Sequence, residues 1–181
     1  TPYALYHPLA PHRLRDVAPE ARIIALLRNP VERAYSHYLH EYARGHEFLS
    51  FEDAIAAEPA RLEGLDELLA SGELMVSDVH KRASYLERGR YARQLESWLS
   101  VFPREQVLVL RSEDLYTNPA ATTARVTDFL GLPPLQGDAF SKHNATAGPP
   151  LRDETRQALT REFASHNARL SEILGWDPRW K

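Results

Sequence analysis

Two short apolar runs, separated by long stretches with helical spacing, dominate the hydrophobic pattern. Residues 22–27 read Arg-Ile-Ile-Ala-Leu-Leu, and residues 106–110 read Gln-Val-Leu-Val-Leu. Each run is too short for a buried helix and contains β-branched residues, so the pattern predicts strands buried on both faces. Because helical stretches lie between and after these strands, the sequence predicts an α/β fold with a parallel sheet flanked by helices.

A helix is predicted directly after the first strand. Asn29 is a good N-cap, Pro30 suits the first helical position, and Glu32 completes an Asn-x-x-Glu capping box. Gly45 is suited to the residue just beyond the helix end. These signals predict a helix over residues 30–44.

Apolar residues spaced three and four apart predict the other helices. Pro59 is expected to split residues 51–70 into two short helices, because proline interrupts helical hydrogen bonding. Asp153 is expected to cap a final helix. Two more helices are predicted from this spacing, over residues 91–102 and 122–130.

Composition limits the classes of protein that the chain can represent. Its 181 residues are 43% hydrophobic and 26% charged, which is typical of one globular domain. The 22 basic and 25 acidic residues give a net charge of −3, so composition gives no electrostatic support for nucleic-acid binding. Because the chain has no cysteine, disulfides, thiolate metal sites and a cysteine nucleophile are excluded.

The sequence also bears on location and on metal binding. No run approaches the ~18 apolar residues of a transmembrane helix, and the start does not read as a secretory signal, so we expect a cytoplasmic protein. The first residue is Thr1 rather than Met, and we expect the chain to be incomplete at its N-terminus. His37 and His40 share a helix without a third ligand, so no metal site is predicted.

The residues around the end of the first strand carry the clearest chemistry. Arg28 lies at the carboxyl end of that strand, where open α/β sheets bind ligands, and a helix N-terminus follows at once. Arg33 and Ser36 are three residues apart and share a helix face. The fork of Arg28 and the hydroxyl of Ser36 suit a phosphate. Alternatively, Arg28 pairs with an acidic neighbour and Ser36 bonds back to the preceding turn.

The pattern Arg-Asn-Pro-x-x-Arg-x-x-Ser, from Arg28 to Ser36, resembles the 3′-phosphate-binding segment of sulfotransferases that use 3′-phosphoadenosine 5′-phosphosulfate (PAPS). The resemblance implies that Arg28 and Ser36 hold the 3′-phosphate. It also implies a P-loop-like sulfotransferase fold, with residues 1–181 as a single domain corresponding to its C-terminal two-thirds. Further segments resemble the family in the same order, at residues 1–3, 49–55, 89–99, 102–110, 113–115, 129–132 and 166–170.

The sequence departs from the family pattern in two places. The Gly- and Lys-containing loop that holds the 5′-phosphosulfate in the family, and commonly its catalytic histidine or glutamate, lie upstream of the Thr-Pro-x-Tyr segment, and this sequence has no such loop. We therefore assign no catalytic residue. Residues 133–150 read as a loop with four prolines and two glycines. In it, Lys142 and His143 are expected to meet cofactor phosphate, although the family's Arg-x-Tyr pair is missing.

The resemblance implies transfer of a sulfuryl group from PAPS to a hydroxyl or amine on a small-molecule or glycan acceptor. The chain would supply the 3′-phosphate-binding half, and adenosine 3′,5′-bisphosphate (PAP) would leave. Tyr3 and Tyr91 are expected near the acceptor, although Tyr91 equally begins an apolar stripe with Leu95 and Trp98. A non-catalytic truncated paralogue that acts as a nucleotide-binding or interaction module is the alternative, and a mainly helical binding protein is a third. The sequence leaves the oligomeric state open.

Overall fold

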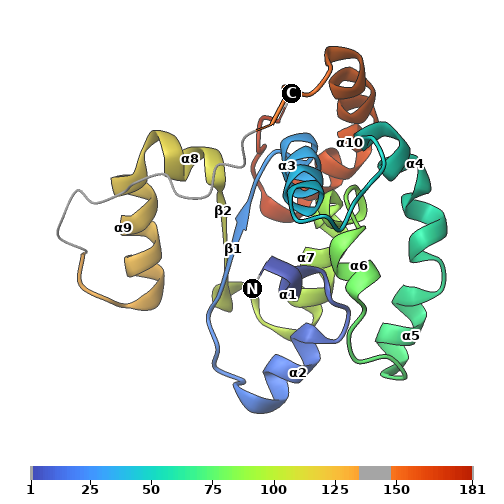
Figure 1. The fold of residues 1–181 in the computed structure, drawn as a ribbon. Coiled ribbons are helices and arrows are strands. Elements are labelled where there is room, and N and C mark those ends of the chain that lie inside the picture. Colours follow the sequence, from blue (N-terminus) through green and yellow to red (C-terminus); the bar gives the residue numbers. More distant parts are fainter. Residues whose placement is uncertain (1, 135–147, 181) are drawn as a thin grey trace.

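A two-stranded parallel sheet lies at the centre of the computed structural model, which describes residues 2–134 and 148–180 (Figure 1). Strand β1 (Ile23–Leu27) pairs with β2 (Val107–Arg111) in a register that runs from Ile23 opposite Val107 to Leu27 opposite Arg111. The predicted parallel sheet is therefore confirmed. The first strand starts one residue later than predicted, and the second is displaced by one residue.

Helices enclose the sheet unevenly. Helix α7 packs against α1, α2 and α10, whereas α8 and α9 lie on the other side of the strands (Figure 1). Within the described residues, no helix is long and apolar enough to cross a membrane. The helices are α1 (Pro2–Tyr6), α2 (Ala10–Val17), α3 (Pro30–Ala43), α4 (Phe51–Leu62), α5 (Leu65–Ser71), α6 (Asp78–Arg82), α7 (Tyr91–Val101), α8 (Ser112–Thr117), α9 (Pro119–Leu130) and α10 (Asp153–Leu174), with 3₁₀ turns η1 (Glu87–Gly89) and η2 (Arg104–Gln106).

The start of α3 confirms the predicted cap but not the whole capping box. The Asn29 side chain accepts hydrogen bonds from the backbone N–H groups of Val31 and Glu32, at 2.9 and 3.4 Å. The backbone N–H of Asn29, however, donates to Glu113 at 2.8 Å. Glu32 instead forms an ion pair with Arg156 of α10. The carboxylate of Glu113 and the guanidinium of Arg156, both brought in by the tertiary fold, thus tie this helix start to α8 and α10.

Two predicted helix boundaries are wrong. Pro59 lies inside α4, which ends at Leu62. The break between α4 and α5 falls at Glu63 and Gly64, and the φ of +72° at Gly64 is a conformation that glycine adopts without strain. Proline removes one helical hydrogen bond, and here that loss does not end the helix. Asp153 is the first residue of α10 rather than its cap, which is Arg152. In the first turn, the Asp153 carboxylate still faces the positive end of the helix dipole.

Strand β1 is buried on one face only, so the prediction of burial on both faces is wrong for it. Ala25 and Leu27 are buried in the main core with Leu95 of α7. Ile24 and Leu26 are 39% and 47% exposed. Side chains alternate along a strand, and the described helices cover only one of the two faces at β1.

Candidate functional site

Three arginines meet at the carboxyl end of β1. Arg28 follows the strand directly, Arg33 lies in the first turns of α3, and Arg88 lies in η1. All three line a cavity of about 470 Å³ that runs along β1 between α1 and α7. The other lining residues are Ala4, Leu5, all five residues of β1, Tyr91, Gln94 and Trp98.

The positive charge in this cavity has no acidic partner in the part of the chain that the structure describes. Within the described residues, no salt bridge involves Arg28, Arg33 or Arg88. Arg33 donates to the carbonyl oxygens of Tyr85 and Ser84 at 2.6 and 3.3 Å, and its buried Nε has no hydrogen-bond partner among these residues. Three guanidinium groups with no carboxylate partner favour an anionic ligand.

Burial and mutual repulsion both disfavour the charged form of these side chains. Burial, followed by the charge of Arg33, lowers the pKa of Arg88 to about 10. Burial likewise lowers the pKa of Arg33, and Arg28 adds to this effect. Arg88 donates a hydrogen bond to the carbonyl oxygen of Lys81 at 3.1 Å. An anion between these groups would relieve the repulsion.

Tyr91 belongs both to the cavity lining and to the core. Its hydroxyl donates to the carbonyl oxygen of Arg28 at 2.9 Å and so holds the end of β1 against α7. Its ring lies 5.7 Å from that of Trp180 and is 4% exposed. The stripe that Tyr91 begins packs into the main core through Leu95 and Trp98.

Ser36 is placed differently from the other predicted phosphate ligands. It is half-buried on α3 and is not among the described residues that line the cavity with Arg28. In the described part of the chain, its hydroxyl makes no hydrogen bond, so the bond to the preceding turn is not formed. The cavity thus brings Arg28, Arg33 and Tyr91 together and leaves Ser36 outside. Lys142 and His143 lie outside the described residues.

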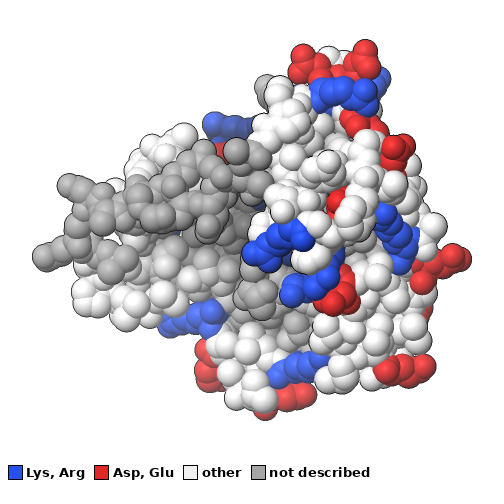
Figure 2. Space-filling model, in the orientation of Figure 1, with Lys and Arg blue, Asp and Glu red and all other residues white. Residues whose placement is uncertain are grey.

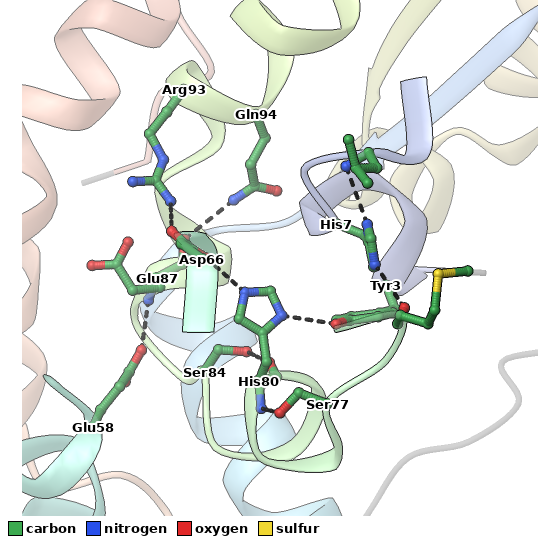
Figure 3. A network of polar contacts seen from close by, with 12 residues as sticks. Tyr3, His7, Glu58, Asp66, Ser77, His80, Ser84, Glu87, Arg93 and Gln94 are labelled. Carbon is green, nitrogen blue, oxygen red and sulfur yellow. Dashed lines mark hydrogen bonds and ion pairs between the residues drawn. The ribbon is translucent and has the colours of Figure 1, made fainter. Parts of the chain in front are cut away.

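A second group of polar side chains contains Tyr3. The Tyr3 hydroxyl lies 2.8 Å from Nδ1 of His80, and Nε2 of His80 lies 2.8 Å from Asp66 (Figure 3). Arg93 donates to the other oxygen of Asp66 at 2.6 Å. The ring of Tyr6 stacks on His80 with centroids 4.2 Å apart. Sequence reasoning did not find His80 or Asp66, since they lie on α6 and α5 and no local spacing links them to Tyr3.

Two buried carboxylates support the segment that carries Arg88. Glu58 accepts hydrogen bonds from the backbone N–H groups of Leu86 and Glu87, and burial raises its pKa to about 7. Glu47 pairs with Arg61 and accepts from the Tyr85 hydroxyl at 3.0 Å. Burial acts to raise the pKa of Glu47, but the hydrogen bonds, that of Arg61 first among them, lower it to about 2. The sequence showed no partner for Glu47.

Charge on the outer surface is mixed in sign. On the face shown in Figure 2, basic and acidic side chains are interspersed among the described residues. Among these residues, no group of three or more histidines and carboxylates is arranged to hold a metal ion. His37 instead faces Glu41 at 3.7 Å.

The comparison with known proteins gives the family. A family model described as the sulfotransferase domain matches residues 6–162, which is most of the chain. The chain belongs to the sulfotransferase family. A solved structure of a sulfotransferase from Alicyclobacillus acidocaldarius has the same fold, with a TM-score of 0.76 and 31% sequence identity. That similarity covers 97% of this chain and 63% of the bacterial one.

Curated relatives of this sulfotransferase chain include enzymes of heparan sulfate. The human bifunctional heparan sulfate N-deacetylase/N-sulfotransferase 2 is 28% identical over 189 residues, which cover 92% of the chain and 20% of the relative. The mouse heparan sulfate glucosamine 3-O-sulfotransferase 6 is 33% identical over 141 residues, or 78% of the chain and 36% of the relative. The chain thus spans about a fifth to a third of the length of these two relatives.

Membership of the sulfotransferase family confirms the predicted fold class and the resemblance on which it was based. The matched region contains β1, the three cavity arginines and the Asp66–His80 pair. Of the polar side chains described above at the arginine-lined cavity and around His80, only Tyr3 lies outside the matched region.

Proposed function

We propose that the chain forms one sulfotransferase domain, residues 1–181, that acts in transfer of a sulfuryl group from PAPS to a hydroxyl or amine. The acceptor is a small molecule or a glycan. The observation that carries this proposal is the cavity at the carboxyl end of β1, where Arg28, Arg33 and Arg88 converge without a carboxylate partner among the described residues.

The donor nucleotide fits the chemistry of the residues at this cavity. Its phosphates and sulfate supply the negative charge that the three arginines lack, and the buried Nε of Arg33 is an unused donor. We assign the 3′-phosphate to the fork of Arg28. Ser36 lies outside the cavity lining, but its hydroxyl has no hydrogen-bond partner among the described residues, and it stays a proposed second donor. Lys142 and His143 remain proposed ligands from outside the described residues.

The chain's residues act mainly by binding and orientation. PAPS supplies the sulfuryl group and a good leaving group. Hydrogen bonds to a charged partner contribute ~1.5–3 kcal/mol each, so Arg28 alone accounts for roughly a 10- to 100-fold gain in nucleotide affinity. This remote binding energy holds the donor in line with the acceptor. Arg33 and Arg88 stabilise the negative charge that develops on the departing phosphate.

We further propose that this chain supplies the 3′-phosphate-binding half of the complete site. All of residues 23–28 line the cavity, which indicates that it follows the edge of β1 that β2 does not occupy. The apolar side chains of Ile24 and Leu26 are exposed beside it. A further parallel strand fits this groove, and the loop after such a strand would arrive beside the three arginines. That is the place for a Gly- and Lys-containing loop, which this sequence lacks.

The experiment is calorimetric titration of the chain with adenosine 3′,5′-bisphosphate, which requires no turnover. We expect binding that weakens at least tenfold in Arg28→Ala and is unchanged in Arg125→Ala, a control on the exposed face of α9. Adenosine 5′-monophosphate, which lacks the 3′-phosphate, should bind at least tenfold more weakly. Equal binding of both nucleotides, or equal binding by Arg28→Ala, would refute the assignment. Ser36→Ala separately tests whether that hydroxyl contributes.

A second candidate function is nucleotide binding without transfer. The three cavity arginines are compatible with it, because they account for binding of a phosphate group and not for the transfer step. The two functions differ in one measurement, transfer of labelled sulfate from PAPS to amine and hydroxyl acceptors. Nucleotide binding with no transfer, even after a strand-and-loop peptide is added, would support the second candidate over the first.

A further inference from the structure

One buried carboxylate fixes the backbone directly before Arg88. The two oxygens of Glu58, on α4, accept hydrogen bonds from the backbone N–H of Leu86 at 3.0 and 2.7 Å, and one of them also accepts from the N–H of Glu87 at 2.8 Å (Figure 3). Glu58 is 2% exposed. Protonation of this carboxylate would replace an acceptor site by an O–H donor, so the hold on the two N–H groups depends on the ionised form.

Contacts on either side of these N–H groups leave the segment little freedom. Arg33 donates to the carbonyl oxygens of residues 84–85, at 3.3 and 2.6 Å. Beyond Arg88, the chain passes so close to α10 that a Cβ atom at Gly89 would lie 2.9 Å from the ring of Phe163. The direction of the Arg88 side chain is therefore set by a backbone that is fixed before and after it.

Arg88 reaches the arginine-lined cavity from a separate part of the chain. Arg28 and Arg33 lie on the connection from β1 into α3, whereas Arg88 lies in η1. Its side chain lines the cavity with the other two. Where the Arg88 guanidinium lies relative to theirs thus depends on how η1 is anchored, and Glu58 supplies the anchor from α4.

The groups around Glu58 act on its protonation in opposite directions. Burial is the main effect and raises the pKa of Glu58 to about 7, although the N–H groups of Leu86 and Glu87 act to lower it. The Glu87 carboxylate raises this pKa and the Arg33 guanidinium lowers it. The other titratable groups near Glu58 are Tyr6 on α1, Arg61 on α4, and Glu63, Asp66, Glu67, Arg90 and Arg93 around a second cavity of about 400 Å³ that Glu58 also lines. Glu58 therefore changes its protonation near neutral pH.

We propose that Glu58 is a positioning residue for the nucleotide, because its carboxylate holds residues 86–87 so that Arg88 contacts the 5′-phosphate, the group that leaves from sulfur. This role rests on the proposed function. Glu58 is not among the described residues that line the arginine-lined cavity, so it acts through Arg88. Loss of its charge, by substitution or by protonation, releases the two N–H groups and lets Arg88 move away from the phosphate.

Calorimetric titration with two nucleotides tests this role. Adenosine 3′,5′-bisphosphate carries both phosphates, whereas adenosine 3′-monophosphate lacks the 5′-phosphate that Arg88 would contact. The amide of Glu58→Gln keeps the size of the carboxylate but has one acceptor oxygen. At pH 8 we expect this variant to bind the bisphosphate at least tenfold more weakly and the monophosphate within twofold of the unaltered chain. Equal weakening of both nucleotides, or tighter binding of the bisphosphate, would overturn the proposal.

Two further variants separate positioning from a general effect of charge or packing. Glu67→Gln removes an exposed carboxylate that lines the same 400 Å³ cavity and forms no hydrogen bond to the backbone of η1 within the described residues, so it should leave both affinities within twofold. In Arg88→Met there is no guanidinium left to position, so adding Glu58→Gln should weaken binding less than twofold further. A second tenfold loss in that double variant would show that Glu58 does not act through Arg88.

The pH dependence of binding tests whether the carboxylate charge is responsible. The unaltered chain and Glu58→Gln are compared as a ratio of affinities for the bisphosphate, in which the titration of the nucleotide itself cancels. We expect a ratio of at least ten at pH 8 that falls to within twofold of one at pH 5.5, where Glu58 is protonated. A ratio that stays the same across this range contradicts the proposal.

Nuclear magnetic resonance of the unaltered chain supplies a test that needs neither a variant nor a nucleotide. The amide signals of Leu86 and Glu87 and the Cζ signal of Arg88 are followed from pH 5.5 to 8. We expect all three to titrate with one midpoint, near pH 7. An Arg88 signal that does not follow the two amides overturns the positioning, even if Glu58→Gln does not fold. If the unaltered chain binds no nucleotide, the proposed function fails, and this titration alone decides whether Glu58 controls the position of Arg88.

Discussion

Replacement of Arg88 by methionine should stabilise the protein and weaken its binding of nucleotide. Methionine keeps most of the apolar stem and removes the charge. Burial, followed by the charge of Arg33, lowers the pKa of Arg88 to about 10. The side chain is still charged at neutral pH, but its charge is less favourable in the folded chain than in the unfolded chain. At about 1.4 kcal/mol per tenfold change in proton affinity, this amounts to roughly 3 kcal/mol before any discount for the part of the side chain that reaches solvent.

Two favourable contacts of Arg88 would be lost in Arg88→Met and offset part of this gain. The hydrogen bond to the Lys81 carbonyl contributes ~0.5–1.5 kcal/mol, and the contact with the Tyr3 ring contributes ~0.5–1 kcal/mol. The net expectation is a free energy of unfolding about 1–2 kcal/mol higher than that of the unaltered chain. Binding should change in the opposite direction, because one charge-assisted hydrogen bond to the nucleotide corresponds to roughly a 10- to 100-fold change in affinity.

Urea unfolding and calorimetric titration with adenosine 3′,5′-bisphosphate measure the two effects. Arg125→Met, on the exposed face of α9, is the matched control and should change the free energy of unfolding by less than ~0.5 kcal/mol. Bound nucleotide should raise the melting temperature of the unaltered chain more than that of Arg88→Met. A destabilised Arg88→Met, or one that binds nucleotide as the unaltered chain does, would show that Arg88 is an ordinary structural residue and that the cavity is not an anion site.

Three other substitutions probe the packing and charge around the site. A Cβ atom at Gly89 would lie 2.9 Å from the ring of Phe163. Gly89→Ala should therefore lower the free energy of unfolding, measured with urea, by about 1–3 kcal/mol. Adding Phe163→Leu to this variant should restore part of the lost stability. Arg61→Met leaves the buried carboxylate of Glu47 without a cationic partner and should lower the free energy of unfolding by about 3 kcal/mol. Arg61→Lys keeps a positive charge and should lower it less, so equal losses in the two variants would contradict this prediction. Burial, with the nearby arginines, lowers the pKa of His37 to about 2, so the unfolded chain takes up a proton near pH 6.5 that the folded chain does not. The stability that His37 supports above pH 6.5 therefore falls as pH drops toward 2, and His37→Asn should make melting temperature less dependent on pH between 6.5 and 4.

The elements that could be predicted are those with local signals. The cap at Asn29 and the positive φ of Gly45 are determined by neighbouring residues, and the end of α3 was predicted within one residue. Capping partners supplied by other elements were not predictable in this way. Glu113 and Arg156 lie 84 and 124 residues from the groups they bind at the start of α3.

The candidate site shows the same difference between residues with local sequence signals and residues brought in by the tertiary fold. Arg28 and Arg33 were found because a strand end and a helix start place them within a few residues of each other. Arg88 reaches the same cavity from a 3₁₀ turn whose position depends on the buried carboxylate of Glu58. His80 had no visible partner in the sequence, because Asp66 and Tyr3 meet it only through the packing of three separate helices.

The wrongly predicted face of β1 carries information of its own. A strand that is permanently half-exposed shows polar residues at alternate positions, whereas positions 24 and 26 are occupied by Ile and Leu. The sequence of β1 is therefore that of a strand covered on both faces, while the described chain covers only one. This mismatch supports the proposal that a further strand lies along the free edge of β1 and brings its own segments over the exposed face. Ile24→Thr with Leu26→Thr should accordingly leave the isolated chain as stable as before, but should prevent a strand-and-loop peptide from restoring sulfate transfer.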